Sequence, residues 1–160
     1  KGRNDRGRAA VHASRKPNRG FPHRGARTAA APERRHLLRR TKVFVVDDEI
    51  IILMSLQSML EELDHVVAGT AASLDEGVRL AGTVDADVAI VDLSLAGKKA
   101  HPIIEVLARR NIPVIASSGY DLGGMDGMTV RGRLQKPYTL GQLDATVKAA
   151  LDGGGGAESD

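Results

Sequence analysis

Short apolar runs alternate with amphipathic segments from Thr41 to Leu151, and this alternation limits the possible folds more than any other feature. The runs lie at Lys42–Val46, His65–Gly69, Asp87–Val91, Asn111–Ser117 and Gly132–Gln135. The first four are rich in apolar side chains, as strands buried on both faces are. Strands that alternate with helices pair in parallel through βαβ crossovers. The sequence therefore predicts an α/β fold with a five-stranded parallel sheet and helices on both faces.

The segments between the runs carry helical patterns. Leucines recur at spacings of three and four within residues 50–63, and the sequences SLDE at 73–76 and TLGQ at 139–142 match the capping box that begins a helix. We expect helices over residues 50–63, 73–81, 102–109 and 139–151. The glycine-rich stretch Asp121–Val130 favours only a short, mobile or missing helix.

The charges divide the chain into two parts. Residues 1–40 carry 13 basic residues and two acids, whereas residues 41–160 carry 10 basic residues and 18 acids, so the overall charge of +3 combines +11 with −8. The first part has no helical or strand period, which predicts a disordered tail with at most weak attraction to nucleic acid. We expect a basic tail over 1–40, a folded domain over 41–151 and a flexible, Gly-rich end over 152–160.

Several classes of protein are excluded or disfavoured by what the sequence lacks. It has no cysteine, which excludes disulfides and thiolate metal sites. Its apolar runs are far shorter than the roughly 18 residues that span a bilayer, and its basic start has no apolar signal segment. We expect a soluble, cytoplasmic protein without membrane insertion.

Polar side chains gather where the predicted strands end. Asp47 and Asp48 follow the first strand, and Asp92 follows the third. Ser117–Ser118 ends the fourth strand, and Lys136 follows the fifth. Ligands of open parallel sheets bind beyond the carboxyl ends of the strands. We therefore expect these side chains to form one site at that edge.

Three carboxylates at one edge need a cation. Two of them about 4 Å apart repel by roughly 4 kcal/mol at an effective dielectric constant of about 20. An all-oxygen site with few ligands is typical of Mg²⁺. An aspartate beside a metal ion and a lysine can attack phosphorus, and ammonium and hydroxyl groups can bind the new phosphoryl oxygens. The residues thus predict phosphoryl transfer to an aspartate.

Four motifs, in this order, resemble the receiver domain of bacterial response regulators. They are VVDDE at 45–49, IVDLSLAG at 90–97, PVIASSGY at 113–120 and LQKPY at 134–138. The resemblance covers about Thr41 to Leu151. It implies a flavodoxin-like sheet with strand order 2-1-3-4-5 and a stand-alone, single-domain regulator.

The resemblance implies a phosphoacceptor and a metal site. Asp92 is similar to the phosphoacceptor of the family, and Asp47 and Asp48 are similar to its acidic pair. These three residues and the backbone carbonyl of Ser94 would hold Mg²⁺, with Asp48 as the direct ligand of the pair.

The resemblance also implies roles around the phosphoryl group. Ser118 resembles the switch hydroxyl, and Lys136 and Gly119 would bind the phosphoryl oxygens. Ser94 and Tyr120 occupy positions that tune the lifetime of the phosphoryl group in related domains. The peptide bond that follows Lys136 is cis in those domains.

Two departures from the family pattern stand out. Ala96 replaces a proline that is common four residues after the phosphoacceptor, and Gly97 follows it, which predicts a looser loop. Arg133 stands where the family usually has the aromatic residue that moves with the switch hydroxyl. This second departure makes the usual aromatic switch doubtful.

The leading interpretation is a receiver that accepts a phosphoryl group on Asp92 from a histidine kinase or histidine phosphotransfer protein. Its output would be contact with an unknown downstream protein or the draining of phosphate from a kinase. It would not be an enzyme beyond catalysing its own phosphorylation and dephosphorylation.

Three alternatives remain open at this stage. The domain could bind proteins without using phosphate, as Arg133 and the loose loop suggest. It could be a phosphatase of the haloacid dehalogenase type, although Ser94 stands where that class has a second aspartate. The tail over 1–40 could bind nucleic acid, which its deletion and a salt titration would reveal.

Overall fold

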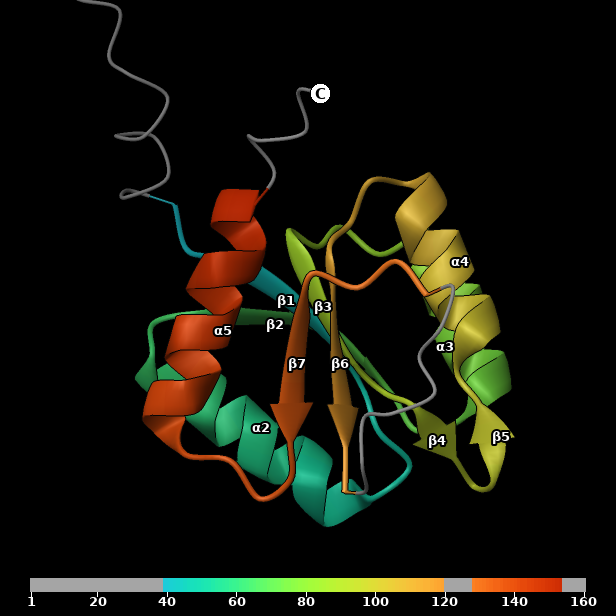
Figure 1. Ribbon diagram of the computed structural model, residues 1–160, viewed down its shortest axis with the longest axis horizontal. Helices are drawn as coiled ribbons and strands as arrows, with labels where there is room; N and C mark the ends of the chain where they lie inside the picture. The colour runs from blue at the N-terminus through green and yellow to red at the C-terminus, as the bar shows by residue number, and fades with distance from the viewer. Residues whose placement is uncertain (1–38, 120–127, 154–160) are drawn as a thin grey trace, which may run out of the picture. The chain divides into compact units, whose positions relative to one another are not determined.

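The computed structural model describes residues 39–119 and 128–153, and Figure 1 shows its helices and strands. These residues form, in chain order, β1 (Lys42–Val46), α2 (Ile50–Glu62), β2 (Val66–Ala71), α3 (Leu74–Ala81), β3 (Val88–Asp92), β4 (Ser94–Leu95), β5 (Lys98–Lys99), α4 (His101–Arg109), β6 (Val114–Ser118), β7 (Gly132–Gln135) and α5 (Leu140–Asp152).

Five strands form one parallel sheet in the order β2-β1-β3-β6-β7. Each neighbouring pair is parallel, and the register places Asp92 of β3 opposite Ser117 of β6. Numbered among the strands of this sheet alone, the order is 2-1-3-4-5. The predicted fold class and strand order are therefore confirmed.

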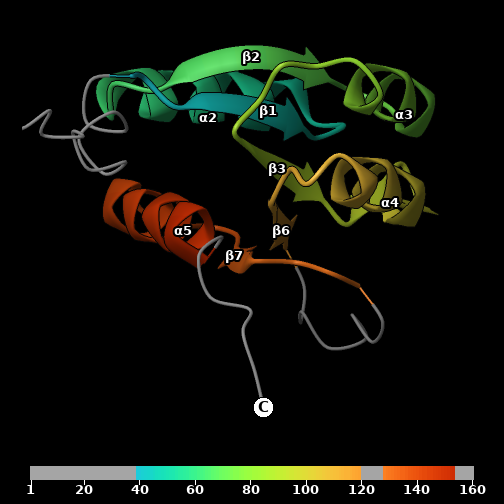
Figure 2. The same ribbon diagram turned by 90° about the horizontal axis from the view of Figure 1, so that it is seen from above.

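Helices cover both faces of the sheet. Figure 2 shows α2 and α5 on one side and α3 and α4 on the other. Each side has its own apolar core: α2 and α5 pack leucines and valines onto one face, and α4 packs isoleucines and a leucine onto the other. Strands buried on both faces explain why the first four runs are almost continuously apolar.

Strand β1 supplies both cores because successive side chains of a strand point to opposite faces. Val43 and Val45 belong to the core under α2 and α5, whereas Phe44 and Val46 belong to the core under α3 and α4. All four side chains are buried. The strand therefore ends in a rigid, fully packed position, and this is where the first acids follow.

Both predicted capping boxes lie where a helix begins, but only the second is complete, because the Glu76 side chain accepts a hydrogen bond from the Ala72 backbone rather than from Ser73. The Ser73 hydroxyl accepts a hydrogen bond from the Glu76 backbone across 3.2 Å at the start of α3. Thr139 and Gln142 exchange side chain to backbone hydrogen bonds at the start of α5. Each cap satisfies backbone donors that the first helical turn leaves free.

Some boundaries differ from the prediction for local reasons. β2 continues to Ala71 because it pairs with β1 as far as Val46. β6 begins only at Val114 because Asn111 has a positive φ of 57° and belongs to a turn. α5 extends one residue past Leu151.

Two further observations concern segments outside the predicted strands and the four predicted helices. β4 and β5 form a two-stranded antiparallel ribbon that the sequence did not predict. In the glycine-rich stretch 121–130, where we expected a short, mobile or missing helix, residues 121–127 lie outside the described residues. Residues 128–130 have no regular secondary structure. Residues 1–38 of the expected tail (1–40) and residues 154–160 of the expected flexible end (152–160) also lie outside the described part, so their predicted disorder stays a prediction. Asp152 belongs to α5 instead of the flexible end.

Candidate functional site

The predicted site residues meet at the carboxyl edge of the sheet. Asp47 directly follows β1, Asp92 is the last residue of β3, and Lys136 directly follows β7. One carboxylate oxygen each from Asp47, Asp48 and Asp92 lies within 4.8 Å of the other two. Parallel strands bring these residues together because their carboxyl ends all face the same way.

The Lys136 ammonium links two of the three acids. It donates to Oδ2 of Asp47 across 2.6 Å and to Oδ2 of Asp92 across 3.0 Å. Glu49 Oε1 lies 4.0 Å from the same nitrogen. One positive charge thus faces three carboxylates at contact distance, and a fourth, that of Asp48, lies beside them.

Burial sets the electrostatics of the site. Asp47 is 1% exposed, and its burial raises the pKa of its carboxyl despite the hydrogen bonds from Lys136 and from the Glu49 backbone. Burial also lowers the pKa of the Lys136 ammonium, but the hydrogen bonds to Asp47 and Asp92 outweigh it and hold this pKa above its usual value. The site therefore has more buried negative charge than Lys136 neutralises.

A divalent cation suits this set of groups. The three clustered ligand atoms are carboxylate oxygens, which hard cations such as Mg²⁺ prefer. Burial, with a smaller contribution from the nearby charge of Asp92, raises the pKa of Asp47, and a second positive charge would offset both effects. The residues present therefore fit the metal that the sequence predicts.

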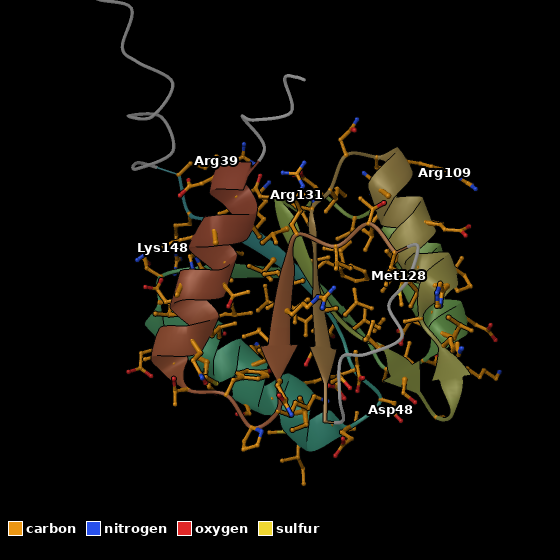
Figure 3. All side chains as sticks on the ribbon, in the orientation of Figure 1. Arg39, Asp48, Arg109, Met128, Arg131 and Lys148 are labelled. Carbon is orange, nitrogen blue, oxygen red and sulfur yellow. The ribbon has the colours of Figure 1, made fainter. Side chains whose placement is uncertain are left out.

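The loop that follows Asp92 is held in place by hydrogen bonds to the carboxylates of Asp92 and Asp48. Asp92 Oδ1 accepts a hydrogen bond from the Ser94 backbone across 3.1 Å, and Asp48 Oδ2 accepts one from the Ala96 backbone across 2.9 Å. Figure 3 shows Asp48 at the carboxyl edge of the sheet, next to β4. The expectation of a loose loop is wrong, because Ser94 to Lys99 form the paired ribbon β4–β5.

The two serines at the end of β6 differ in their burial and in their hydrogen bonds. Ser117 is 1% exposed, and among the described residues its hydroxyl has no hydrogen-bond partner. Ser118 is half-buried, and its carbonyl accepts a hydrogen bond from the Lys136 backbone across 2.8 Å. Gly119 is exposed beside Lys136. Ser118 and Gly119 therefore lie beside Lys136 at the accessible end of the strand.

For the remaining residues that the sequence singled out, the structure gives at most their position and exposure. Ser94 begins β4 and is exposed, whereas Tyr120 lies outside the described residues. Arg133 is exposed on β7. The Lys136–Pro137 peptide bond is cis, as the resemblance implies.

Comparison with known families agrees with this arrangement. The model of the response regulator receiver domain matches residues 43–148, which span every strand of the sheet. The chain belongs to this family.

The chain is also similar to individual response regulators. The chain is 28% identical over 119 residues to the phyllosphere-induced regulator PhyR of Methylorubrum extorquens, covering 69% of this chain and 43% of that protein. It therefore spans less than half the length of this curated relative.

Solved structures with the same fold include PhyR proteins. The PhyR of Brucella abortus is 26% identical, with a TM-score of 0.65 over 72% of this chain and 49% of that one. The receiver domain of Erythrobacter litoralis PhyR, at 24% identity, has a TM-score of 0.66 over 78% of this chain and 99% of that one. The receiver fold of this chain is thus shared with PhyR-type regulators.

A groove beside the site of this receiver domain was not foreseen from the sequence. It has a volume of about 580 Å³ and lies between α2 and the loop after β7. Its lining residues are Glu49, Ile52, Ser55, Met59, Gly119, Lys136, Pro137 and Tyr138. Periodicity along α2 identifies the helix, but only packing shows which loop faces it.

α2 also carries an exposed apolar patch, whose residues are not among those that line the groove. Ile50 is 60% exposed, Ile51 79% and Met54 65%. These are the large apolar side chains most exposed in the described part of the chain. In the sequence, the unbroken run III at 50–52 after the acids is a signal that could have pointed to it.

Within residues 39–119 and 128–153, none of the helices is long and apolar enough to cross a membrane.

Proposed function

We propose that this receiver domain accepts a phosphoryl group on Asp92 from a histidine kinase or a histidine phosphotransfer protein, in a reaction that needs Mg²⁺. The observation that carries the proposal is the contact of the Lys136 ammonium with both Asp92 and Asp47, with Asp48 beside them. An acceptor carboxylate, a fixed ammonium and an all-oxygen cation site are the parts that phosphoryl transfer to an aspartate requires.

In the transfer itself, a carboxylate oxygen of Asp92 attacks the phosphorus of a phosphohistidine. The bond between phosphorus and the imidazole nitrogen breaks, and its electron pair returns to the imidazole. The Ser94 backbone and Lys136 hold Asp92 in a fixed orientation before the attack. Lys136 and the Ser118 hydroxyl then donate hydrogen bonds to the transferred phosphoryl oxygens.

Mg²⁺ held by Asp47, Asp48 and Asp92 would neutralise charge that develops on the phosphoryl group. The carbonyl of Ser94 is the further ligand that we assign from the family pattern. Ser94 and Tyr120 are our candidates for tuning how long the phosphoryl group persists.

The patch on α2 supports a macromolecular phosphoryl donor. A donor histidine must reach Asp92 at the edge of the sheet, and the exposed Ile51 lies one helical turn before Ser55, which lines the groove together with Lys136. Apolar side chains that are exposed together on a helix favour association with another protein. We therefore place the donor over α2.

For the output, we propose contact with a downstream protein or the draining of phosphate from a kinase, in the cytoplasm. The structure of Bartonella quintana PhyR is described as that of an anti-anti-sigma factor, and this chain covers 50% of it. The half of that protein that this chain covers corresponds to a receiver domain. A downstream partner of the kind that an anti-anti-sigma factor binds is therefore one proposal among several for this chain.

A phosphate-independent binding module is the second candidate. The exposed Arg133 on β7 favours it, because the family usually has at this position the aromatic side chain that moves with the switch hydroxyl. In this case the acids at the sheet edge would have no acceptor role.

The test is phosphorylation of the intact chain by acetyl phosphate, with and without Mg²⁺, read by intact mass. We expect one phosphoryl group that requires Mg²⁺ and is lost in Asp92→Asn. No addition to the intact chain, while a control receiver domain is labelled under the same conditions, would support the phosphate-independent module instead.

A further inference from the structure

The turn that closes the β4–β5 ribbon has an unusual backbone. Ala96 and Gly97 have φ angles of +50° and +78°, and the flanking residues Leu95 and Lys98 are paired. Two-residue hairpin turns with positive φ at both central positions match the twist of the flanking strands. Glycine adopts such angles freely, whereas alanine does so only when its surroundings compensate for the strain.

The hydrogen bond to Asp48 provides that compensation. In this conformation the Ala96 N–H donates to Asp48 Oδ2 across 2.9 Å. Leu95, next to it, is 1% exposed and anchors the ribbon in the core under α3 and α4. The donor therefore sits on a fixed piece of backbone rather than on a free loop.

Asp48 differs from the other two acids in how it is held. Asp47 and Asp92 both contact the Lys136 ammonium, and each also accepts a backbone hydrogen bond. Asp48 is half-buried, and within the described part of the chain the Ala96 N–H is the donor to its carboxylate. The direction in which Asp48 points thus depends on the ribbon.

We propose that the backbone of Ala96 is a positioning group that orients Asp48 for binding a divalent cation together with Asp47 and Asp92. The inference rests on the metal site of the proposed function and adds the ribbon to it. Groups that hydrogen-bond a metal ligand fix its orientation, and their loss typically lowers metal affinity about 10- to 100-fold. A proline at position 96 would abolish the contact, since it has no N–H and a fixed negative φ.

The same coupling acts in the opposite direction. If the ribbon strengthens cation binding by some factor, the cation stabilises the ribbon by the same factor. Cation binding would therefore hold Lys98 and Lys99 of β5 more firmly in place. This links the occupancy of the metal site to a basic, exposed segment of the surface.

The test compares Ala96→Pro with Ala96→Gly in the full chain. Ala96→Gly keeps the N–H and tolerates positive φ, so we expect its Mg²⁺ dissociation constant, measured by calorimetry, to stay within about threefold of the parent value. Ala96→Pro removes the N–H, and we expect its dissociation constant to rise about 10-fold or more. A folded Ala96→Pro that binds Mg²⁺ like the parent would overturn the inference while leaving the proposed metal site intact.

A second measurement on the unmodified chain does not depend on the folding of a variant. Saturating Mg²⁺ should slow hydrogen exchange of the Ala96 amide about 10-fold or more, and the effect should disappear in Asp48→Asn. Unchanged exchange in a chain that binds Mg²⁺ would contradict the coupling. A parent chain that neither binds Mg²⁺ nor accepts phosphate would refute the proposed function and this inference together.

Discussion

Lys136 Nζ lies 3.0 Å from Asp92 Oδ2, and this contact connects the segment after β7 to the last residue of β3. The two side chains are 13% and 9% exposed, so the pair is largely shielded from water. A pair of this kind costs much to break, because the remaining charge stays buried without a partner. The same lysine therefore supports the stability of the domain and its proposed chemistry.

Lys136→Met should destabilise the domain by about 3 kcal/mol at pH 7, measured by urea unfolding. The loss should shrink as the pH falls toward 4. Burial already raises the pKa of Asp47 despite the hydrogen bond from Lys136, and loss of the ammonium should raise it further. The folded variant then takes up a proton before the unfolded chain does, so it gains stability on acidification.

Lys148→Met is the matched control for this prediction. Lys148 pairs with Asp144 across 2.6 Å on α5, but its side chain is 66% exposed. Its loss should change the free energy of unfolding by about 0.5 kcal/mol or less. Equal effects of the two substitutions would show that the Lys136 contacts contribute no more than a surface pair.

Mg²⁺ should stabilise the folded domain. A cation that binds only the folded chain, present at about 100 times its dissociation constant, adds about 2.7 kcal/mol to the free energy of unfolding. Asp48→Asn should lose most of this gain because it removes one of three clustered carboxylates. Urea unfolding of the parent chain and of Asp48→Asn, each with Mg²⁺ and with EDTA, measures the two gains in stability. An equal gain in the variant would argue against Asp48 as a ligand.

The convergence of Asp47, Asp92 and Lys136 could be predicted because it depends on little more than topology. Each lies at or directly after the end of a strand, and parallel strands end at one edge. Recognising the alternation of strands and helices was therefore enough to bring together residues up to 89 positions apart, although the strand before Lys136 has only one buried apolar side chain, Leu134. The distances between their side chains were beyond such reasoning.

The ribbon and the groove could not be predicted for two different physical reasons. Ala96 gives no local signal for positive φ, and that conformation is stabilised by the pairing of Leu95 with Lys98 and by the contact with Asp48, which is distant in sequence. The groove needs α2 to face Tyr138, which depends on how two helices pack on the sheet rather than on any local pattern. Properties that arise from contacts distant in sequence are the ones that were missed.

Ile51→Asp should slow phosphorylation by a protein donor about 10-fold, because it removes a large apolar contact and places an unpaired charge in the proposed interface. Phosphorylation by acetyl phosphate should not change, because the small donor needs no docking surface. Any histidine kinase or phosphotransfer protein that labels the parent chain can supply the comparison.

Val66→Asp is the control for the α2 patch. Val66 is also an exposed apolar residue, 37% exposed, but it lies at the start of β2 rather than on α2. Its substitution should leave transfer from both donors unchanged. Equal slowing by the two variants would indicate a general defect rather than loss of a docking surface.

The phenol of Tyr138 should ionise at unusually high pH. Burial raises the pKa of Tyr138 to about 12, from an unperturbed value near 10. The chain has two tyrosines and no tryptophan, so Tyr120→Phe leaves Tyr138 as the one phenol that absorbs near 295 nm on ionisation. In that variant the absorbance should rise near pH 12 in the folded domain and near pH 10 in urea.

This shift also predicts how stability depends on pH. The stabilisation from the neutral, buried phenol is complete below pH 10, where both states keep the proton. Between pH 10 and about 12 the unfolded chain loses the proton first, so the free energy of unfolding should fall by roughly 1.4 kcal/mol per pH unit. Tyr138→Phe in the Tyr120→Phe background should remove this part of the pH dependence. An ionisation near pH 10 in the folded domain would mean that the Tyr138 phenol is exposed to water. The wall of the groove would then pack less tightly around this side chain than the structure shows.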